Sequence, residues 1–180
     1  MSKAGKIIEN PISGEKFRFI MTAEETDGDY FQFEWTLKRD GIMPFAASHP
    51  LQSKTFEVLS GELTITVDNV TEVIQAGGSI VVPREAVHQP RNTGEGALRC
   101  LVTLRPALHA DLILETVCNL ASAGLANKRG QPRFLRMAVL AEAYPEGYYA
   151  HVPIPVQQFV IKVGAFIGRM LGYQPVYIQR

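Results

Sequence analysis

Two histidines and one lysine are the residues of this 180-residue chain whose types and spacing could support chemistry. His49 and His88 lie in two short blocks, residues 47–61 and residues 77–92, which bracket a run of predicted strands. Imidazole nitrogens can bind a divalent metal ion or exchange hydrogen bonds with a ligand. Lys54 lies in the first block, and its ammonium group could hold a carboxylate, phosphate or enolate-like oxygen.

The two blocks resemble the two motifs of the cupin superfamily. In that family, two histidines and a glutamate of the first motif and one histidine of the second hold a divalent metal ion inside a small β-barrel. By this resemblance, His49 and His88 are retained, whereas Ala47 and Lys54 stand where the other histidine and the glutamate belong. The resemblance covers residues 44–106 and implies a jelly-roll barrel with a degenerate metal site.

The expected donor set is poor for a metal ion. The first block is also similar to a bacterial cupin subgroup with C-terminal helices, in which Gln52 would occupy its usual place. Two imidazoles and an amide oxygen are weak ligands together, and Lys54 would add a cation where a cation must bind. We therefore predict no cofactor, with iron, manganese, nickel or zinc at His49 and His88 as the alternative.

The resemblance also sets which side chains of the strand around Lys54 would face inward. If Lys54 faces inward, Phe56 and Val58 lie on the same side and Glu57 on the other, so Glu57 cannot replace the missing carboxylate. Lys54 could instead reach the barrel mouth, or act as an imine-forming nucleophile if its pKa is lowered. The predicted ligand-binding residues are His49, Gln52, Lys54, Phe56 and His88. No catalytic residue is assigned.

The strand prediction also stands on the residue pattern alone. Phe31, Phe33 and Trp35 alternate with polar residues, and Asp68 and Asn69 separate two runs in the manner of a hairpin. Many short strands at nearly regular spacing up to residue 104 favour a sandwich or barrel. The three aromatic side chains could line a ligand pocket, although packing in the core is their commoner role.

Beyond Pro106 the apolar period changes to three and four residues, which predicts helices over residues 108–120, 132–144 and 155–171. Gly164 and Gly168 favour close packing against a neighbouring helix, and polar interruptions exclude a membrane span. The fold class is therefore mainly β, a jelly-roll barrel followed by two or three helices. The predicted domains are residues 1–106, the barrel, and residues 107–180, a helical extension packed on the barrel or at a dimer interface.

Charge and composition limit the possible partners. Lys plus Arg and Asp plus Glu are both 18, so no strong field attracts nucleic acid or an anionic membrane. We expect neither partner, and we expect a homodimer, because near-neutral proteins tend to associate and many cupins pair. The first residues contain no signal peptide, which predicts a cytoplasmic location.

The remaining cysteines and histidines have structural interpretations. Cys100 and Cys118 are too few for a disulfide framework and are expected to be buried free thiols. His109 and His151 lie in the helical extension, where surface or packing roles are expected.

Three functional hypotheses stay open from the sequence. The favoured one is a cupin that binds a small polar or anionic molecule inside the barrel. The second is an enzyme, either a metal-dependent dioxygenase or isomerase with a reduced ligand set or a metal-free enzyme using Lys54 and the histidines. The third is a structural protein that serves dimerisation.

Overall fold

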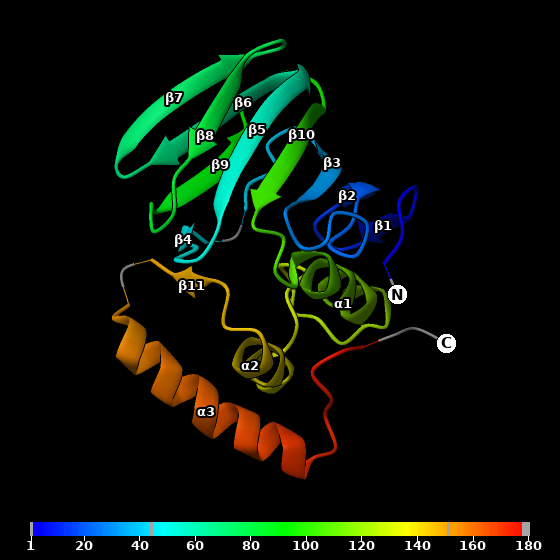
Figure 1. Cartoon of the computed structure of the whole chain (residues 1–180), viewed down its shortest axis with the longest axis vertical. Helices are drawn as coiled ribbons and strands as arrows, with labels where there is room; N and C mark the ends of the chain where they lie inside the picture. The colour runs from blue at the N-terminus through cyan, green and yellow to red at the C-terminus, as the bar shows by residue number, and fades with distance from the viewer. Residues whose placement is uncertain (1, 44, 151, 178–180) are drawn as a thin grey trace.

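A β-barrel built from two antiparallel sheets occupies one end of the molecule, and three helices lie across its open end (Figure 1). The computed structural model describes residues 2–43, 45–150 and 152–177. The six-stranded sheet runs in the order β1 (Ile7–Asn10), β2 (Glu15–Met21), β3 (Phe31–Leu37), β10 (Leu98–Arg105), β5 (Ser53–Ser60), β8 (Ser79–Val82). The five-stranded sheet runs in the order β11 (Tyr148–Tyr149), β4 (Ala47–Ser48), β9 (His88–Asn92), β6 (Glu62–Val67), β7 (Val70–Gln75). The predicted mainly β class and the C-terminal helices are confirmed.

Local sequence explains the strands and the turn between β6 and β7. Alternate side chains of β3 are buried and half-buried, as expected for a strand with one face in the core. The hairpin turns at Asp68 and Asn69, whose φ angles of 45° and 72° are both positive. Asparagine and aspartate tolerate this left-handed conformation better than most residues, and it matches the twist of the flanking strands.

The inner face of the six-stranded sheet carries the residues that matter for the site. Leu104 on β10 lies directly between Lys54 on β5 and Phe31 on β3, so these three side chains share one face. Phe56 is buried on the same side of β5, whereas Glu57 is exposed. The predicted inward direction of Lys54 and outward direction of Glu57 are therefore confirmed.

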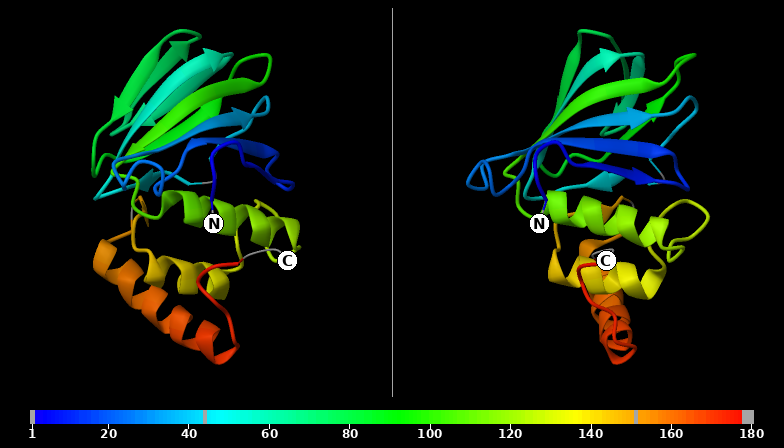
Figure 2. Two further views of the ribbon diagram at one scale, coloured as in Figure 1. Left: turned by 45° about the vertical axis from the view of Figure 1, so that its right-hand side comes forward. Right: turned by 90° about the vertical axis from the view of Figure 1, so that its right-hand side faces the viewer.

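The three helices are α1 (Ala110–Ser122), α2 (Phe134–Ala143) and α3 (Ile154–Met170). Figure 2 shows α1 next to the barrel, α2 beneath it and α3 on the outside. The segment between α2 and α3 returns to the barrel, because β11 pairs with β4 and becomes the edge of the five-stranded sheet. The helical extension therefore contributes a short strand to the barrel as well as a cover for its open end.

Close packing of α3 on α2 depends on two glycines. A Cβ atom at Gly164 would lie 2.9 Å from Cβ of Ala138, and one at Gly168 would lie 2.7 Å from Cγ2 of Val139. Both distances are below normal contact, so the predicted tight packing at this glycine pair is confirmed. Within the described residues, no helix is both long and apolar enough to cross a membrane.

Candidate functional site

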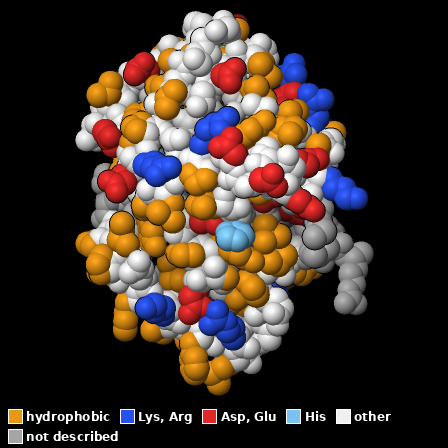
Figure 3. All heavy atoms as spheres, in the orientation of Figure 1, with side chains coloured by type: hydrophobic (Ala, Val, Ile, Leu, Met, Phe, Trp, Pro, Cys, Tyr) orange, Lys and Arg blue, Asp and Glu red, His pale blue; other side chains and the backbone are white. Residues whose placement is uncertain are grey.

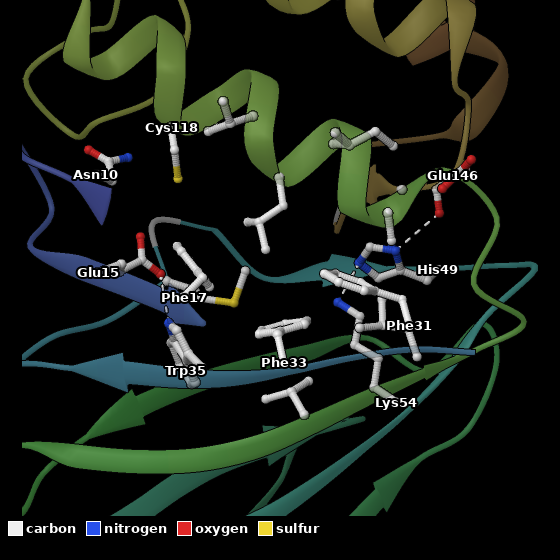
Figure 4. Close-up of a pocket in the computed structure, with 18 of the residues that line it drawn as sticks. Asn10, Glu15, Phe17, Phe31, Phe33, Trp35, His49, Lys54, Cys118 and Glu146 are labelled. Carbon is white, nitrogen blue, oxygen red and sulfur yellow. Dashed lines mark hydrogen bonds between the residues drawn. The ribbon is translucent and has the colours of Figure 1, made fainter. Parts of the chain in front are cut away.

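A cavity of about 350 Å³ lies between the inner face of the six-stranded sheet and the helices (Figure 4). Its floor is aromatic and is made by Phe17, Phe31, Phe33 and Trp35. Its roof comes from one face of α1, with Ala110, Ile113, Leu114, Val117 and Cys118. The remaining apolar wall comes from α2 and the residue after it, with Met137, Leu140, Ala141 and Tyr144. Residues three and four apart share one face of a helix, which explains how each helix presents a continuous apolar surface.

Lys54, which is buried, and His49, which is half-buried, form a hydrogen-bonded pair at one end of this cavity. The Lys54 side chain donates a hydrogen bond from Nζ to Nε2 of His49 over 2.8 Å, and Lys54 is only 8% exposed. On the other side of the ring, Nδ1 of His49 donates to the backbone carbonyl of Glu146 over 3.1 Å. A carbonyl accepts only, so the partners assign the neutral His49 tautomer with its proton on Nδ1 and its lone pair on Nε2.

The Lys54 amine has no counter-ion. Among the described residues, no carboxylate lies within ion-pair distance of its Nζ atom. Burial without a counter-ion disfavours the charged form and lowers the pKa of Lys54 from 10.5 to about 7. Burial, followed by the charges of Lys54 and His88, holds the pKa of His49 well below its ordinary value of 6.5. Near pH 7, Lys54 and His49 together therefore carry at most one positive charge.

His88 lies beside this pair, with its ring centroid 5.5 Å from that of His49. Its Nδ1 atom donates to the carbonyl of Ala86 over 3.1 Å, while its Nε2 atom is buried without a partner among the described residues. Burial and the Lys54 charge lower the pKa of His88 to about 4, so the ring is neutral. His88 does not line the main cavity wall. Ala47, which pairs directly with His88 across β4 and β9, lines an adjoining cavity of about 360 Å³.

Gln52 and Phe56, the other two predicted ligand residues, both line the main cavity. The Gln52 amide nitrogen donates to the carbonyls of Pro106 and Ala107, each over 2.9 Å. This side chain therefore ties the start of β5 to the connection between β10 and α1. Phe56 lies next to Trp35, with ring centroids 6.4 Å apart, and extends the aromatic floor.

The opposite end of the cavity is acidic. Figure 4 shows Asn10 and Glu15 there, far from His49 and Lys54. The Glu15 carboxylate accepts from Nε1 of Trp35 over 3.2 Å and from Oγ of Ser13 over 2.8 Å, and burial raises its pKa. Phe31, near Lys54, and Trp35, which binds Glu15, are four positions apart on β3, and this step corresponds to about 13 Å along the strand.

Sequence reasoning missed the residues that hold His49 from the helical side. A Cβ atom at Gly147 would lie 3.0 Å from Cε1 of His49, so only glycine leaves the ring its present position. The carboxylate of Glu146 binds the backbone N–H and Nδ1 of His109, which is a packing contact at the start of α1. His151 lies outside the described residues. The three- and four-residue spacing of apolar residues in the sequence could have identified the helix faces that line the cavity. No local sequence pattern indicates that Gly147 lies against His49.

These side chains do not fit the metal ion that the barrel type implies. The described residues contain no group of three or more histidine, cysteine or acidic side chains that could hold a metal ion. The Nε2 lone pair of His49 is used by Lys54, which leaves only Nε2 of His88 free. A first-row ion needs several converging donors, and a positive ammonium group opposes its entry.

Comparison with known families agrees with the barrel geometry. Residues 26–104 match the family model described as "Cupin domain". This part of the chain, residues 26–104, is a cupin domain. The comparison with curated proteins found no match.

Three solved structures are similar to part of this chain at low sequence identity. A predicted oxalate decarboxylase from Thermotoga maritima is 17% identical, with 57% of this chain and 92% of that one covered and a TM-score of 0.50. The cupin domain of Cnp3 from Schizosaccharomyces pombe is 19% identical over 56% of this chain and 68% of that one, with a TM-score of 0.48. An RmlC-like cupin from Shewanella frigidimarina is 20% identical over 59% and 88%, with a TM-score of 0.48.

The lowered pKa of Lys54 predicts how stability depends on pH. Between about pH 7 and 10.5 the unfolded chain binds a proton at Lys54 that the folded chain does not, so the free energy of unfolding should rise with pH there. The slope should approach about 1.4 kcal/mol per pH unit. We expect Lys54→Met to be more stable than the unchanged protein at pH 7, with the difference shrinking towards pH 10.

Urea unfolding at several pH values in this window measures the effect. Lys16→Met is the matched control, because Lys16 is exposed on β2 and its substitution should leave the pH dependence unchanged. A stability difference between Lys54→Met and the unchanged protein that does not vary with pH would contradict the buried position of this amine.

Proposed function

We propose that this cupin binds a small molecule with an apolar body and one anionic head group in the cavity between the barrel and the helices. The head group contacts the Lys54 ammonium, and the body lies on the aromatic floor. The observation that supports this proposal is the buried amine without a carboxylate partner at the end of an apolar cavity.

The energetic argument concerns the charge of Lys54. An unpaired buried ammonium costs several kcal/mol, which explains why burial drives its pKa down. A carboxylate at hydrogen-bonding distance would compensate that charge and restore the protonated form. Because the pair then forms in a poorly solvated cavity, the ion contact is stronger than it would be at the surface.

The rest of the cavity selects the body of the ligand. Its walls are mostly aromatic and aliphatic side chains, so they favour a hydrocarbon body, at about 25 cal/mol for each Å² of apolar surface removed from water. A cavity of about 350 Å³ lies in the range of small-molecule sites. A compact polar anion such as phosphate would leave these walls unused, so an arylalkyl or alkyl carboxylate suits the cavity better.

Calorimetric titration with 3-phenylpropanoate and its uncharged analogue 3-phenylpropanamide tests the proposal. We expect the acid to bind more tightly than the amide near pH 6 and to lose up to about tenfold in affinity for each pH unit above about 7, because the free amine must first be protonated. Titrations in buffers of different ionisation enthalpy should show about one proton taken up at about pH 9 and almost none at about pH 6.

Two variants locate the head group. Lys54→Met should weaken the acid roughly 30-fold and leave the amide nearly unchanged, because a hydrogen bond to a charged group is lost. Lys16→Met, on the outer face of β2, should change neither. Equal affinity of acid and amide in the unchanged protein, or phosphate binding more tightly than the aromatic acid, would refute the proposal.

The competing hypothesis is a metal-dependent cupin enzyme with a reduced ligand set. The free Nε2 atom of His88 is the one observation in its favour. Metal analysis of protein purified without chelators decides between the two: stoichiometric iron, manganese, nickel or zinc that is lost in His88→Gln would favour the enzyme.

A further inference from the structure

We propose a further activity for the same site: Lys54 forms a reversible imine with an apolar aldehyde or ketone that enters the cavity, with His49 as the proton acceptor. This inference rests on the proposed function in that the cavity must admit a small molecule. It differs in the chemical class of the molecule, which is a carbonyl compound rather than an acid.

His49 is a base in direct hydrogen-bond contact with the amine of Lys54. Nε2 of His49 accepts from Nζ of Lys54 over 2.8 Å, and the bond from Nδ1 to the Glu146 carbonyl keeps the lone pair on that side of the ring. The absence of a side chain at Gly147 leaves room for the ring in this position. An amine in contact with an oriented base is the arrangement that activates a nucleophile.

The reaction balances without an oxidant or reductant. The neutral Lys54 amine forms a C–N bond to the carbonyl carbon, and His49 carries one proton from that nitrogen to the carbonyl oxygen, which gives a neutral carbinolamine. His49 then carries the remaining nitrogen proton to the hydroxyl group, which leaves as water while nitrogen forms the second bond to carbon. One C=O bond is exchanged for one C=N bond, and one water molecule leaves.

The surroundings favour the product. The apolar walls hold few groups that would stabilise water, and a lowered pKa leaves much of the Lys54 amine neutral near pH 7. The titratable groups around this end are His49 and His88, with Tyr144 and Glu146 from the helical side. The carboxylate of Glu146 is held by His109 and does not pair with Lys54.

Trapping with 3-phenylpropanal and cyanoborohydride tests this activity, with intact mass and peptide mapping as the readout. We expect one adduct on Lys54 whose mass equals that of the aldehyde less its oxygen. Its rate should rise up to about tenfold per pH unit below about pH 7 and then level off, whereas surface lysines continue to accelerate up to about pH 10. His49→Gln should slow trapping at Lys54 at least about tenfold.

The outcomes separate this inference from the proposed function. If 3-phenylpropanoate binds but the aldehyde labels Lys54 no faster than Lys16, the imine chemistry is refuted and the binding function stands. If the aldehyde labels Lys54 selectively but the acid does not bind, the anionic ligand is refuted and the imine chemistry stands. If neither occurs, both fail. If 3-phenylpropanoate protects Lys54 of the unchanged protein from labelling by the aldehyde, both the binding function and the imine chemistry are supported, and no variant is needed.

A second inference comes from an independent feature, the outer face of α3. Five large apolar side chains repeat at alternating three- and four-residue steps: Val156, Phe159, Val163, Phe166 and Met170. Phe159 is 69% exposed, Phe166 66% and Met170 74%. This spacing is that of the core positions of a two-helix coiled coil, and it lies opposite the glycines that pack on α2.

We infer that a second copy of this chain covers this stripe, with its own α3 packed antiparallel about a two-fold axis near Val163. In that arrangement Val156 lies opposite Met170, and Phe159 lies opposite Phe166, so the stripe is complementary to itself. The charged residues of α3 are Lys162 and Arg169, both outside the stripe. No charge therefore has to be buried.

The size of the surface supports a dimer. Figure 3 shows hydrophobic side chains at the lower end of the molecule, where Figure 1 places α3. The stripe and its flanking residues are nine large apolar residues, each between 39% and 74% exposed. Apolar residues scattered singly on a surface are ordinary, whereas a continuous apolar surface of this kind marks an interaction site. The flanking residues are Ile154, Val160, Ile167 and Leu171.

Sedimentation equilibrium of the full chain tests the dimer. We expect the unchanged protein to be a dimer and the double variant Phe159→Glu/Phe166→Glu to be a monomer. The circular dichroism spectrum of the double variant should be that of the unchanged protein. Its melting temperature should be close to that of the unchanged protein at a concentration low enough to dissociate the dimer. Val73→Glu, an exposed apolar residue on β7, is the matched control and should stay dimeric. A monomeric unchanged protein at about 100 μM, or a double variant that stays dimeric, would refute the inference. Binding of a monomer to neutral lipid vesicles would show that a membrane surface is the occupant instead.

Discussion

The hydrogen bond between Lys54 and His49 is the interaction on which the rest of the site depends. By the resemblance of the motifs, Lys54 stands where the cupin motif has a glutamate, so an amine takes the position of a carboxylate. The same bond uses the Nε2 lone pair of His49, and the positive charge of the amine opposes a metal ion at this end of the cavity. The two ligand classes proposed above, an anion and a carbonyl compound, both follow from this amine.

The barrel alone does not make the cavity. The aromatic floor belongs to the six-stranded sheet, but the roof and one wall belong to α1 and α2, and the carbonyl that orients His49 comes from the segment after α2. The short strand β11 fastens that segment to the barrel beside His49. The helical extension is therefore part of the site rather than an attachment to it.

Much of the architecture follows from sequence pattern because it depends on local periodicity. Alternation put Phe31, Phe33 and Trp35 on one face of β3. The motif resemblance put Lys54 inward, and strand parity then put Phe56 on the same side. The three- and four-residue spacing located all three helices to within about two residues. The hairpin at Asp68 and Asn69 followed from turn preferences alone. These features need no knowledge of which elements meet in space.

The remaining features depend on contacts between distant segments. His49 and Glu146 are 97 positions apart in the chain, and no local pattern links them. The same holds for Gly147, whose missing side chain matters only because a ring lies 3.0 Å away. The sequence left open whether the aromatic residues of β3 serve the core or a pocket, and they do both, because their rings are buried by the helices while bordering the cavity. His88 is close to the pair but outside the main wall, a distinction that strand parity cannot make.

The helix α2 has two independent faces, and this has a consequence for how such proteins diverge. One face, with Met137, Leu140 and Ala141, borders the cavity, whereas the other, with Ala138 and Val139, fits the glycines of α3. Substitutions on the first face can reshape the chamber without disturbing either the strand register or the helix pair. A single short helix therefore sets one apolar wall of the cavity independently of the amine and imidazole at the cavity end.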